Sequence, residues 1–196
     1  MVERAAAGLF GAPAYGVFVN GYTSTADDGR PTHLWLGRRS LTKATWPGLL
    51  DCIAAGGVSA GKLPIDAMSE ECREEASMPD ELIARARSTG GVCYNGFDET
   101  GWALKRDVLF CFDLLCPPDW QPACMDGDEC GLGEVEDFEL ISIEDVAVQL
   151  ASGKEAFKPN VGVVIIDFLV RHGLVVSPNE PDYLPLLQEL RNAECR

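Results

Sequence analysis

The sequence predicts an α/β domain in which a mixed, partly antiparallel sheet is covered by helices on both faces. Runs of alternating apolar and polar side chains, which are typical of strands, recur along the chain. Other segments carry apolar residues at helical spacing. With 196 residues and 46% hydrophobic content, the chain is long enough to build one sizeable core.

The first half of the chain predicts a hairpin followed by two helices. Residues 15–22 and 33–37 alternate like strands and enclose a polar, glycine-bearing loop, so we expect them to pair antiparallel. The glycine pair Gly56 and Gly57 predicts a turn with positive φ and close backbone approach. Helices are predicted at residues 64–76, where Pro64 suits the first turn, and at residues 79–88.

The second half predicts strands first and helices last. Strands are expected at residues 91–97 and 102–115, and helices at residues 143–152, 161–172 and 181–191. A long loop covers residues 117–133. Asn160 can cap the middle helix, and Gly173 follows its end. This apolar helix is too short for a membrane span and is interrupted by Asp167 and Arg171.

Composition bounds the partners and the compartment. The net charge of −15 argues against nucleic acid or an anionic membrane as a partner, because both need a basic surface. Residues 1–16 lack the basic start of a signal peptide, so we expect a cytoplasmic protein. Eight irregularly spaced cysteines predict free thiols. Cys124 and Cys130 could approach each other, but only two histidines disfavour a zinc site. The oligomeric state stays open.

Four glutamates crowd into two turns of the helix predicted at residues 64–76. They are Glu70, Glu71, Glu74 and Glu75, and the last three share one face. Like charges so placed cost roughly 0.2–0.5 kcal/mol per pair, and a bound divalent cation would offset this cost. The pattern therefore predicts a site for Mg²⁺ or Mn²⁺. The other flank carries an apolar stripe that can pack on a sheet, made of Ile65, Met68, Cys72 and Ala76.

Two further segments carry charges suited to a diphosphate site. Arg38, Arg39 and Lys43 form the densest cationic patch of this acidic chain and could bind phosphate oxygens, although a solvated turn is the simpler explanation. Farther along, alternation over residues 133–138 would point Glu134 and Glu136 to the same side. An exposed acidic strand end is the alternative there.

The order of glycine, helix and paired glutamates resembles the Nudix box, a signature of hydrolases that cleave organic diphosphates. On this sequence the leading glycine of the box falls at Gly56, its central metal-binding glutamate at Glu71 and its closing glutamates at Glu74 and Glu75. Three positions depart from the usual pattern: Lys62 replaces a glutamate, Glu70 an arginine and Ser77 a glycine.

A narrower resemblance covers roughly residues 8–191. WLGRRSLTKATWPGLLDCIAAGG, EECREEASMP, DGDECGLGEVEDF and FKPNVGVVIIDFLVRHG together look like the Nudix branch fused to thiamine pyrophosphokinase. The resemblance implies a Nudix-type α/β/α sandwich over residues 17–196, with residues 1–16 as a junction to a preceding domain. It also implies a small-molecule substrate, thiamine diphosphate or its oxo and oxy analogues, cut to the monophosphate.

The resemblance also implies roles for individual residues. Glu71, Glu74 and Glu75 would hold the metal, with Glu134 or Glu136 as a further ligand or base, and Glu75 or Glu136 would take a proton from water. The expected substrate-binding residues are Arg38, Arg39, Lys43, Gly56, Gly57 and Lys62. Trp46 or Tyr94 could stack on the rings, although single aromatics are more often part of a core.

Three alternatives stay open. A Nudix diphosphatase could act on another small nucleoside diphosphate derivative, and a decayed site could serve as a binding module, since Lys62 replaces a glutamate. An isopentenyl diphosphate isomerase has a similar GEVE element but needs a histidine-rich metal site, for which two histidines are too few.

Overall fold

The structure is a computed structural model, and it describes residues 4–25, 29–97, 101–124, 133–153, 155–176, 178 and 180–192. The strands are β1 (Ala14–Thr23), β2 (His33–Arg39), β3 (Leu50–Cys52), β4 (Ala54–Gly57), β5 (Arg87–Phe97), β6 (Leu104–Leu115) and β7 (Val135–Ser142). The helices are the 3-10 helix η1 (Arg4–Phe10), α1 (Pro64–Ala76), α2 (Asp80–Ile83), α3 (Ile143–Ala151), α4 (Pro159–Arg171) and α5 (Tyr183–Glu189).

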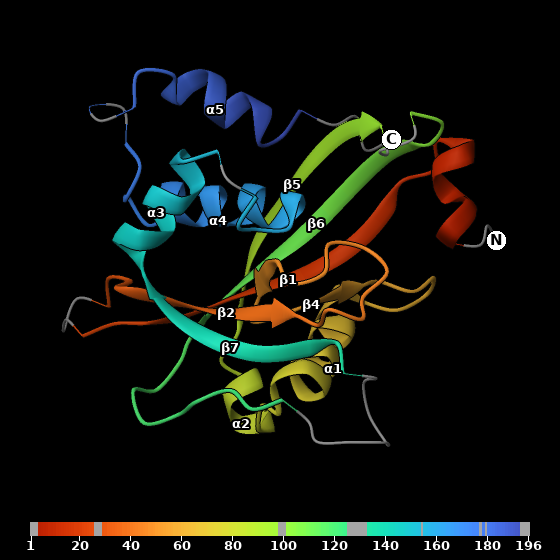
Figure 1. Ribbon diagram of the computed structural model, residues 1–196. Coiled ribbons are helices and arrows are strands. Elements are labelled where there is room, and N and C mark those ends of the chain that lie inside the picture. The colour runs from red at the N-terminus through yellow and green to blue at the C-terminus, as the bar shows by residue number, and fades with distance from the viewer. Residues whose placement is uncertain are drawn as a thin grey trace.

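Within the described residues the seven strands form one mixed sheet between two helical layers, as predicted (Figure 1). The strand order is β3-β2-β1-β6-β5, with β4 added on β1 and β7 added on β2. The pairing of β1 with β6 is parallel, and the other pairings are antiparallel. β1 also changes partner along its length, because residues 16–19 pair with β4 and residues 21–23 pair with β2.

Each helical layer buries an apolar stripe against the sheet. Below the sheet in Figure 1, α1 buries Met68, Cys72 and Ala76, as the spacing predicts. Ile65 is 46% exposed instead, and Ala67 joins the stripe in its place. Above the sheet, the predicted apolar residues of α4 are all buried: Val161, Val164, Ile165, Phe168 and Leu169. Emptying the Phe168 position alone would cost about 3–5 kcal/mol.

Three predicted elements differ in the structure. Gly56 and Gly57 do not form a turn, because both pair with β1 as part of β4, and neither has a positive φ. The helix expected at residues 79–88 is limited to α2, since β5 already begins at Arg87, where the chain joins the hydrogen-bond ladder of β6. Asn160 does not cap α4. Lys158 is the N-cap residue, and Asn160 lies in the first turn.

Several other expectations meet the structure in part. β1 begins at Ala14, so the predicted junction of residues 1–16 overlaps the first strand, and the domain division stays a prediction. Cys52, Cys72, Cys111 and Cys116 are free thiols, as predicted, and Cys130 lies outside the described residues. No helix in the described ranges is long and apolar enough to cross a bilayer.

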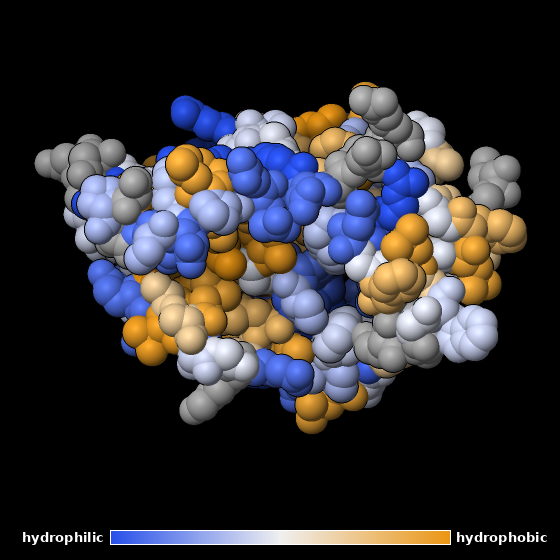
Figure 2. Space-filling model, turned by 90° about the horizontal axis from the view of Figure 1, so that it is seen from above, coloured by the Kyte–Doolittle hydropathy of each residue, from blue (hydrophilic) through white to orange (hydrophobic). Residues whose placement is uncertain are grey.

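The face seen from above is not uniformly apolar. In Figure 2 the hydrophobic residues gather in separate areas on either side of a more hydrophilic middle, where the surface is hollowed. No single apolar area therefore spans this face.

Candidate active site

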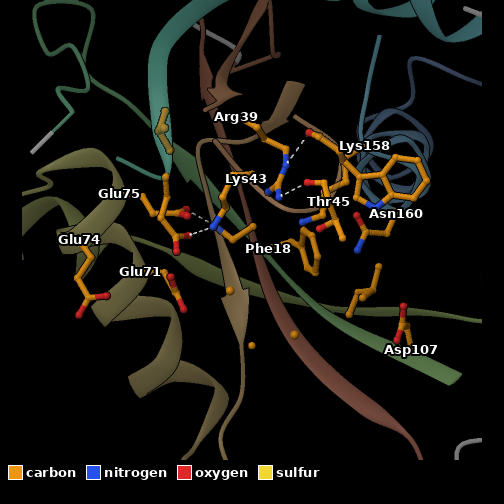
Figure 3. A pocket seen from close by; sticks show the side chains of 18 of the residues that line it. Phe18, Arg39, Lys43, Thr45, Glu71, Glu74, Glu75, Asp107, Lys158 and Asn160 are labelled. Atoms are coloured by element: carbon orange, nitrogen blue, oxygen red, sulfur yellow. Dashed lines mark hydrogen bonds and ion pairs between the residues drawn. The ribbon is translucent and has the colours of Figure 1, made fainter. Parts of the chain in front are cut away.

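A cavity of about 750 Å³ lies beside the part of β1 that pairs with β4. Its carboxylates are Glu71, Glu74, Glu75, Glu134 and Asp107, and its cationic side chains are Arg39, Lys43, Lys105 and Lys158. Figure 3 shows the three α1 glutamates on one side, Lys43 between, and Phe18, Lys158, Asn160 and Asp107 on the other side. The fold thus brings together most of the charged residues predicted for the site.

Gly56 makes room for the first of the α1 glutamates. A Cβ atom at this position would lie 1.7 Å from the Oε1 atom of Glu71, a distance at which neither group could stay in place. The positive φ expected at this glycine is absent. The Glu71 carboxylate occupies the space that a side chain at this position would take.

Glu75 is the most deeply placed of the α1 carboxylates. Its Oε2 accepts a hydrogen bond of 2.8 Å from the backbone N–H of Ala55. Removal from water and the neighbouring charge of Asp51 raise the pKa of Glu75 well above its ordinary value, although the Ala55 N–H opposes this shift. An added cation beside Glu75 would favour the ionised form.

The carboxylates fit a hard divalent cation that is completed by its substrate. In the described part of the chain, no three acidic, histidine or cysteine side chains already make a closed metal cage. Mg²⁺ does not need one, because it is usually held by one or two carboxylates together with water and substrate phosphates. The acidic groups of α1 repel one another, and this repulsion contributes to the raised pKa of Glu75. A bound divalent cation would reduce the repulsion.

Two of the predicted phosphate-binding cations line the cavity but are already paired. Lys43 Nζ lies 2.6 Å from Glu134 Oε2. Arg39 contacts the buried Asp51 at 2.9 Å and donates to the carbonyls of Thr45 and Trp46 at 2.9 and 3.0 Å. Arg39 is therefore held as part of the cavity wall by three groups, whereas Lys43 forms an ion pair with one carboxylate.

Asp51 joins two walls of the cavity. Besides Arg39, it binds Lys158 Nζ at 2.9 Å, and its own side chain is 9% exposed. Lys158 also lies 5.5 Å from the centre of the Phe18 ring. The pairing of Asp51 with two cations fixes the N-terminal end of α4 against the segment that follows β2.

Three predicted site residues do not line the cavity. Arg38 points to the other face of β2, where it pairs with Glu139 and donates to the carbonyl of Gly48 at 2.8 Å. Lys62 pairs with Glu70 in a separate hollow. Glu136 is exposed and lies at a β-bulge, since Arg38 pairs with Asp137 while Arg39 pairs with Val135.

The bulge explains why the alternation argument failed for Glu136. One extra residue in β7 breaks the period of two, so Glu134 lines the cavity and Glu136 does not. The proton-accepting role assigned to Glu136 therefore has no geometric support.

Comparison with known proteins places the fold and the cavity in a family. The NUDIX domain matches residues 19–161 of the chain. The chain belongs to the Nudix family. It is 44% identical to Nudix hydrolase 20, chloroplastic, and 43% identical to Nudix hydrolase 24, chloroplastic, both from Arabidopsis thaliana. Each match covers 99% of this chain, but 48% and 50% of those proteins, so the chain spans about half the length of these relatives.

Solved structures agree with the Nudix fold. The crystal structure of DR0079 from Deinococcus radiodurans has a TM-score of 0.56 at 22% identity, covering 77% of this chain and 80% of that one. RenU, a Nudix hydrolase from M. smegmatis, has a TM-score of 0.54 at 13% identity, covering 84% and 88%. The predicted Nudix-type α/β/α sandwich is confirmed, as is membership in a family of hydrolases.

Two departures from the Nudix box compensate each other. Lys62 and Glu70 carry charges opposite to those of the usual residues, and they form an ion pair with each other. The third departure, Ser77, has φ of 50° at the C-cap of α1, the left-handed conformation that favours glycine. Serine there costs on the order of 1 kcal/mol and leaves the carboxylate face unchanged.

The sequence argument missed part of the cavity. Asp107, Lys105 and Asn160 line it, and no motif had singled them out for this purpose. Trp46, which was proposed to stack on a substrate, does line the cavity and has φ of 55°, unusual for a side chain of this size. Tyr94 does not line it but donates a hydrogen bond of 2.5 Å to Asp107.

Proposed function

We propose that this Nudix domain hydrolyses the phosphoanhydride of thiamine diphosphate and of its oxidised analogues, oxothiamine and oxythiamine diphosphate, giving a monophosphate and inorganic phosphate. The single observation that carries the chemistry is the convergence of four glutamates, three from α1 and Glu134 from just before β7, in one cavity that also contains cations. The substrate class rests on the motif resemblance, which spans nearly the whole chain.

The metal would be held by Glu71, Glu74 and Glu75, with Glu134 across the cavity. When bound, Mg²⁺ or Mn²⁺ supplies charge neutralisation at the phosphate oxygens. Glu75, once ionised, accepts the proton of the attacking water, because the Ala55 N–H orients its carboxylate in the cavity wall. Glu134 is the remaining candidate for this role.

The cationic residues act on the phosphate that leaves. Lys43 can exchange Glu134 for a phosphate oxygen, since both partners lie on the cavity wall and a metal ion can take over the glutamate. Arg39 and Lys158 stay with Asp51 and keep the wall positively charged where the diphosphate would lie. Gly57, which lines the cavity without a side chain, lets the substrate approach the backbone of β4, while Gly56 leaves room for the Glu71 carboxylate.

A substrate panel tests this proposal. The organic products are separated by chromatography and quantified with Mg²⁺, with Mn²⁺ and with excess chelator, on thiamine diphosphate, its oxo and oxy analogues, ADP-ribose, NADH, nucleoside triphosphates and dinucleoside polyphosphates. We expect the thiamine series to have the highest kcat/KM, with the oxidised analogues best. A nucleotide that exceeds the series by tenfold, about 1.4 kcal/mol in transition-state binding, would refute the thiamine assignment and leave the Nudix chemistry standing.

Complete inactivity on the panel would favour the alternative of a decayed binding module. The ion pair between Lys62 and Glu70 argues against a decayed site. Lys62, which replaces the usual glutamate, has a partner of opposite charge and leaves the carboxylates proposed to bind the metal unchanged. The cytoplasmic location expected from the sequence remains a proposal of the same kind.

A further inference from the structure

The side of the cavity opposite the α1 glutamates has its own set of polar groups. Figure 3 shows Asp107 and Asn160 on this side, with Phe18 between them and the acidic residues. Asp107 comes from β6 and Asn160 from the first turn of α4, so two elements far apart in the sequence supply them. Neither residue is needed for the metal or for the attacking water.

Asp107 is held in place by the strand next to its own. In the sheet it pairs with Ala14 of β1 on one side and with Tyr94 of β5 on the other. Tyr94 donates a hydrogen bond of 2.5 Å to Asp107 Oδ2, and burial together with this bond raises the pKa of Tyr94, so the phenol stays a donor. Ala14 carries only a methyl group. Asp107 therefore remains on the cavity wall with acceptor capacity beyond its bond to Tyr94.

Asn160 adds an amide with an orphaned oxygen. Its Oδ1 atom is buried, and within the described part of the chain no donor reaches it. A buried acceptor without a partner is destabilising, so a ligand donor that reached this oxygen would recover free energy. An amide offers both a donor and an acceptor, and it suits a ring edge that carries both.

The floor of this side suits a flat ring. The Phe18 ring lies over Gly16, where a Cβ atom would come within 3.0 Å of Phe18 Cε2. Trp46 forms a second aromatic wall of the same cavity, with Lys105 Nζ 5.9 Å from its ring centre. Aromatic surfaces bind planar heterocycles, while the polar groups around them fix which edge is accepted.

We propose that Asp107 and Asn160 select a substrate whose ring is an amino-substituted nitrogen heterocycle, with Asp107 accepting a hydrogen bond from the amino group. This inference rests on the proposed function, because it concerns the organic part of the same diphosphate. Tyr94 is a positioning residue that acts through Asp107. The aminopyrimidine of thiamine carries the required edge, and so does adenine.

The test compares substrates that differ in the amino group. KM and kcat are measured for thiamine diphosphate and its 4′-deamino analogue with Mg²⁺. For wild type we expect a KM lower by about tenfold or more for the amino compound, the scale of a hydrogen bond to a charged group. In Asp107→Asn the Tyr94 hydroxyl binds the amide oxygen, so an NH₂ group faces the substrate amine, and we expect the preference to fall to about threefold or less.

Two further variants separate recognition from damage. Tyr94→Phe should lower the preference to an intermediate value with little change in kcat, because Asp107 keeps its charge but loses its orientation. Lys105→Met removes a charge from the same side of the cavity without removing the acceptor, so the preference should persist. Asp119→Asn removes an exposed carboxylate that does not line the cavity and controls for net charge.

The outcomes distinguish this inference from the proposed function. If thiamine diphosphate is not cleaved, the same comparison is made with ADP-ribose and its hypoxanthine counterpart. If wild type prefers ADP-ribose to its hypoxanthine counterpart and Asp107→Asn abolishes this preference, the inference is supported although the thiamine assignment fails. A wild-type enzyme without the preference on either pair, or a preference unchanged in Asp107→Asn, overturns it.

Discussion

Two carboxylates near opposite faces of the sheet have opposite surroundings. Glu75, on α1, accepts one backbone N–H and lies among Asp51, Glu71 and Glu134, and its pKa is raised. Asp113, on β6, is buried on the α4 side, where it binds Arg171 at 2.5 and 3.0 Å, His172 at 2.8 Å and Asn20 at 3.1 Å.

The partners of Asp113 reverse the effect of burial. Loss of water would by itself raise the pKa of this carboxyl group, but the hydrogen bonds from His172 and Arg171 outweigh it and hold the pKa below its ordinary value. Asp113 thus has its counter-charges within the chain and stabilises the fold. Glu75 accepts a backbone N–H but has no cationic partner among its described hydrogen bonds, as expected for a group whose counter-charge comes from a ligand.

The largest expected effect comes from removing the metal. Excess chelator should lower phosphate release from the preferred substrate at least about 1,000-fold, and added Mg²⁺ or Mn²⁺ should restore it, because the acidic face then lacks the charge that binds the diphosphate. Circular dichroism should stay unchanged, since the fold does not need the ion. Full activity in chelator would show that no metal ion supplies the counter-charge of Glu75, so Glu75 would not differ from Asp113 in the way proposed.

Glu75→Gln should lower kcat roughly 100-fold or more, the scale of a lost base or charge stabiliser. The same variant should raise the midpoint of urea unfolding at pH 7, because it removes a buried charge that lacks a partner. Asp119→Asn is the charge-matched control, with both values near wild type. A Glu75→Gln protein with a lower kcat and also a lower urea midpoint would contradict the view that Glu75 lowers stability in the metal-free protein.

Asp113→Asn should show the reverse pattern. We expect a loss of about 2 kcal/mol in the free energy of unfolding, since Arg171 and His172 lose a buried anionic partner while Arg171 keeps its bond of 2.7 Å to Asp167. Turnover at a temperature where the variant is folded should stay within about threefold of wild type. A large loss of kcat without loss of stability would place Asp113 in the active site.

The pH dependence of stability should differ in sign for the two groups. The folded pKa of Asp113 lies below its unfolded value of about 3.9, so its contribution is present above that pH and is lost as the pH falls further. The folded pKa of Glu75 lies above its unfolded value of about 4.3, so ionisation costs stability as the pH rises from there. Urea midpoints are measured from pH 3 upward in steps of about half a unit. The midpoint of the wild type minus that of Asp113→Asn should rise with pH, and the midpoint of the wild type minus that of Glu75→Gln should fall.

The smallest effect belongs to the surface pair of Lys62, which precedes α1, and Glu70, which lies on α1. Lys62→Glu should lower the urea midpoint only slightly, and adding Glu70→Lys should restore it, because the two charges are then exchanged. KM should not change in either protein, since Lys62 lies outside the cavity. A raised KM in the single variant would return Lys62 to the substrate-binding residues.

Local patterns predicted which glutamates of α1 lie together. Helical spacing puts Glu71, Glu74 and Glu75 on one face, and all three line the cavity, although their roles stay a prediction. Arg38 was misplaced because neighbouring residues of a strand point to opposite faces, so Arg38 and Arg39 of β2 cannot share one site. Glu136 was misplaced because a bulge between β2 and β7 breaks the alternation on which its assignment relied. Gly56 was found, but its reason, the closeness of Glu71, depends on packing between α1 and β4.

The other side of the cavity was out of reach for a different reason. Asp107 and Asn160 meet only because β6 lies parallel to β1 and α4 crosses above them, and no single segment of sequence carries that arrangement. The fold class, by contrast, follows from patterns within segments, and it was predicted correctly.

The parallel pairing of β1 with β6 also bears on how the chain folds. Asn20 and Asp113, which face each other in this pairing, are 93 residues apart in sequence. Closing so long a loop costs entropy before any contact repays it, so this pairing is expected to be among the slow steps of folding. During synthesis the cavity cannot exist until β6 has left the ribosome, and a nascent chain shorter than about residue 115 has the glutamates of α1 without the cavity that they line in the folded domain.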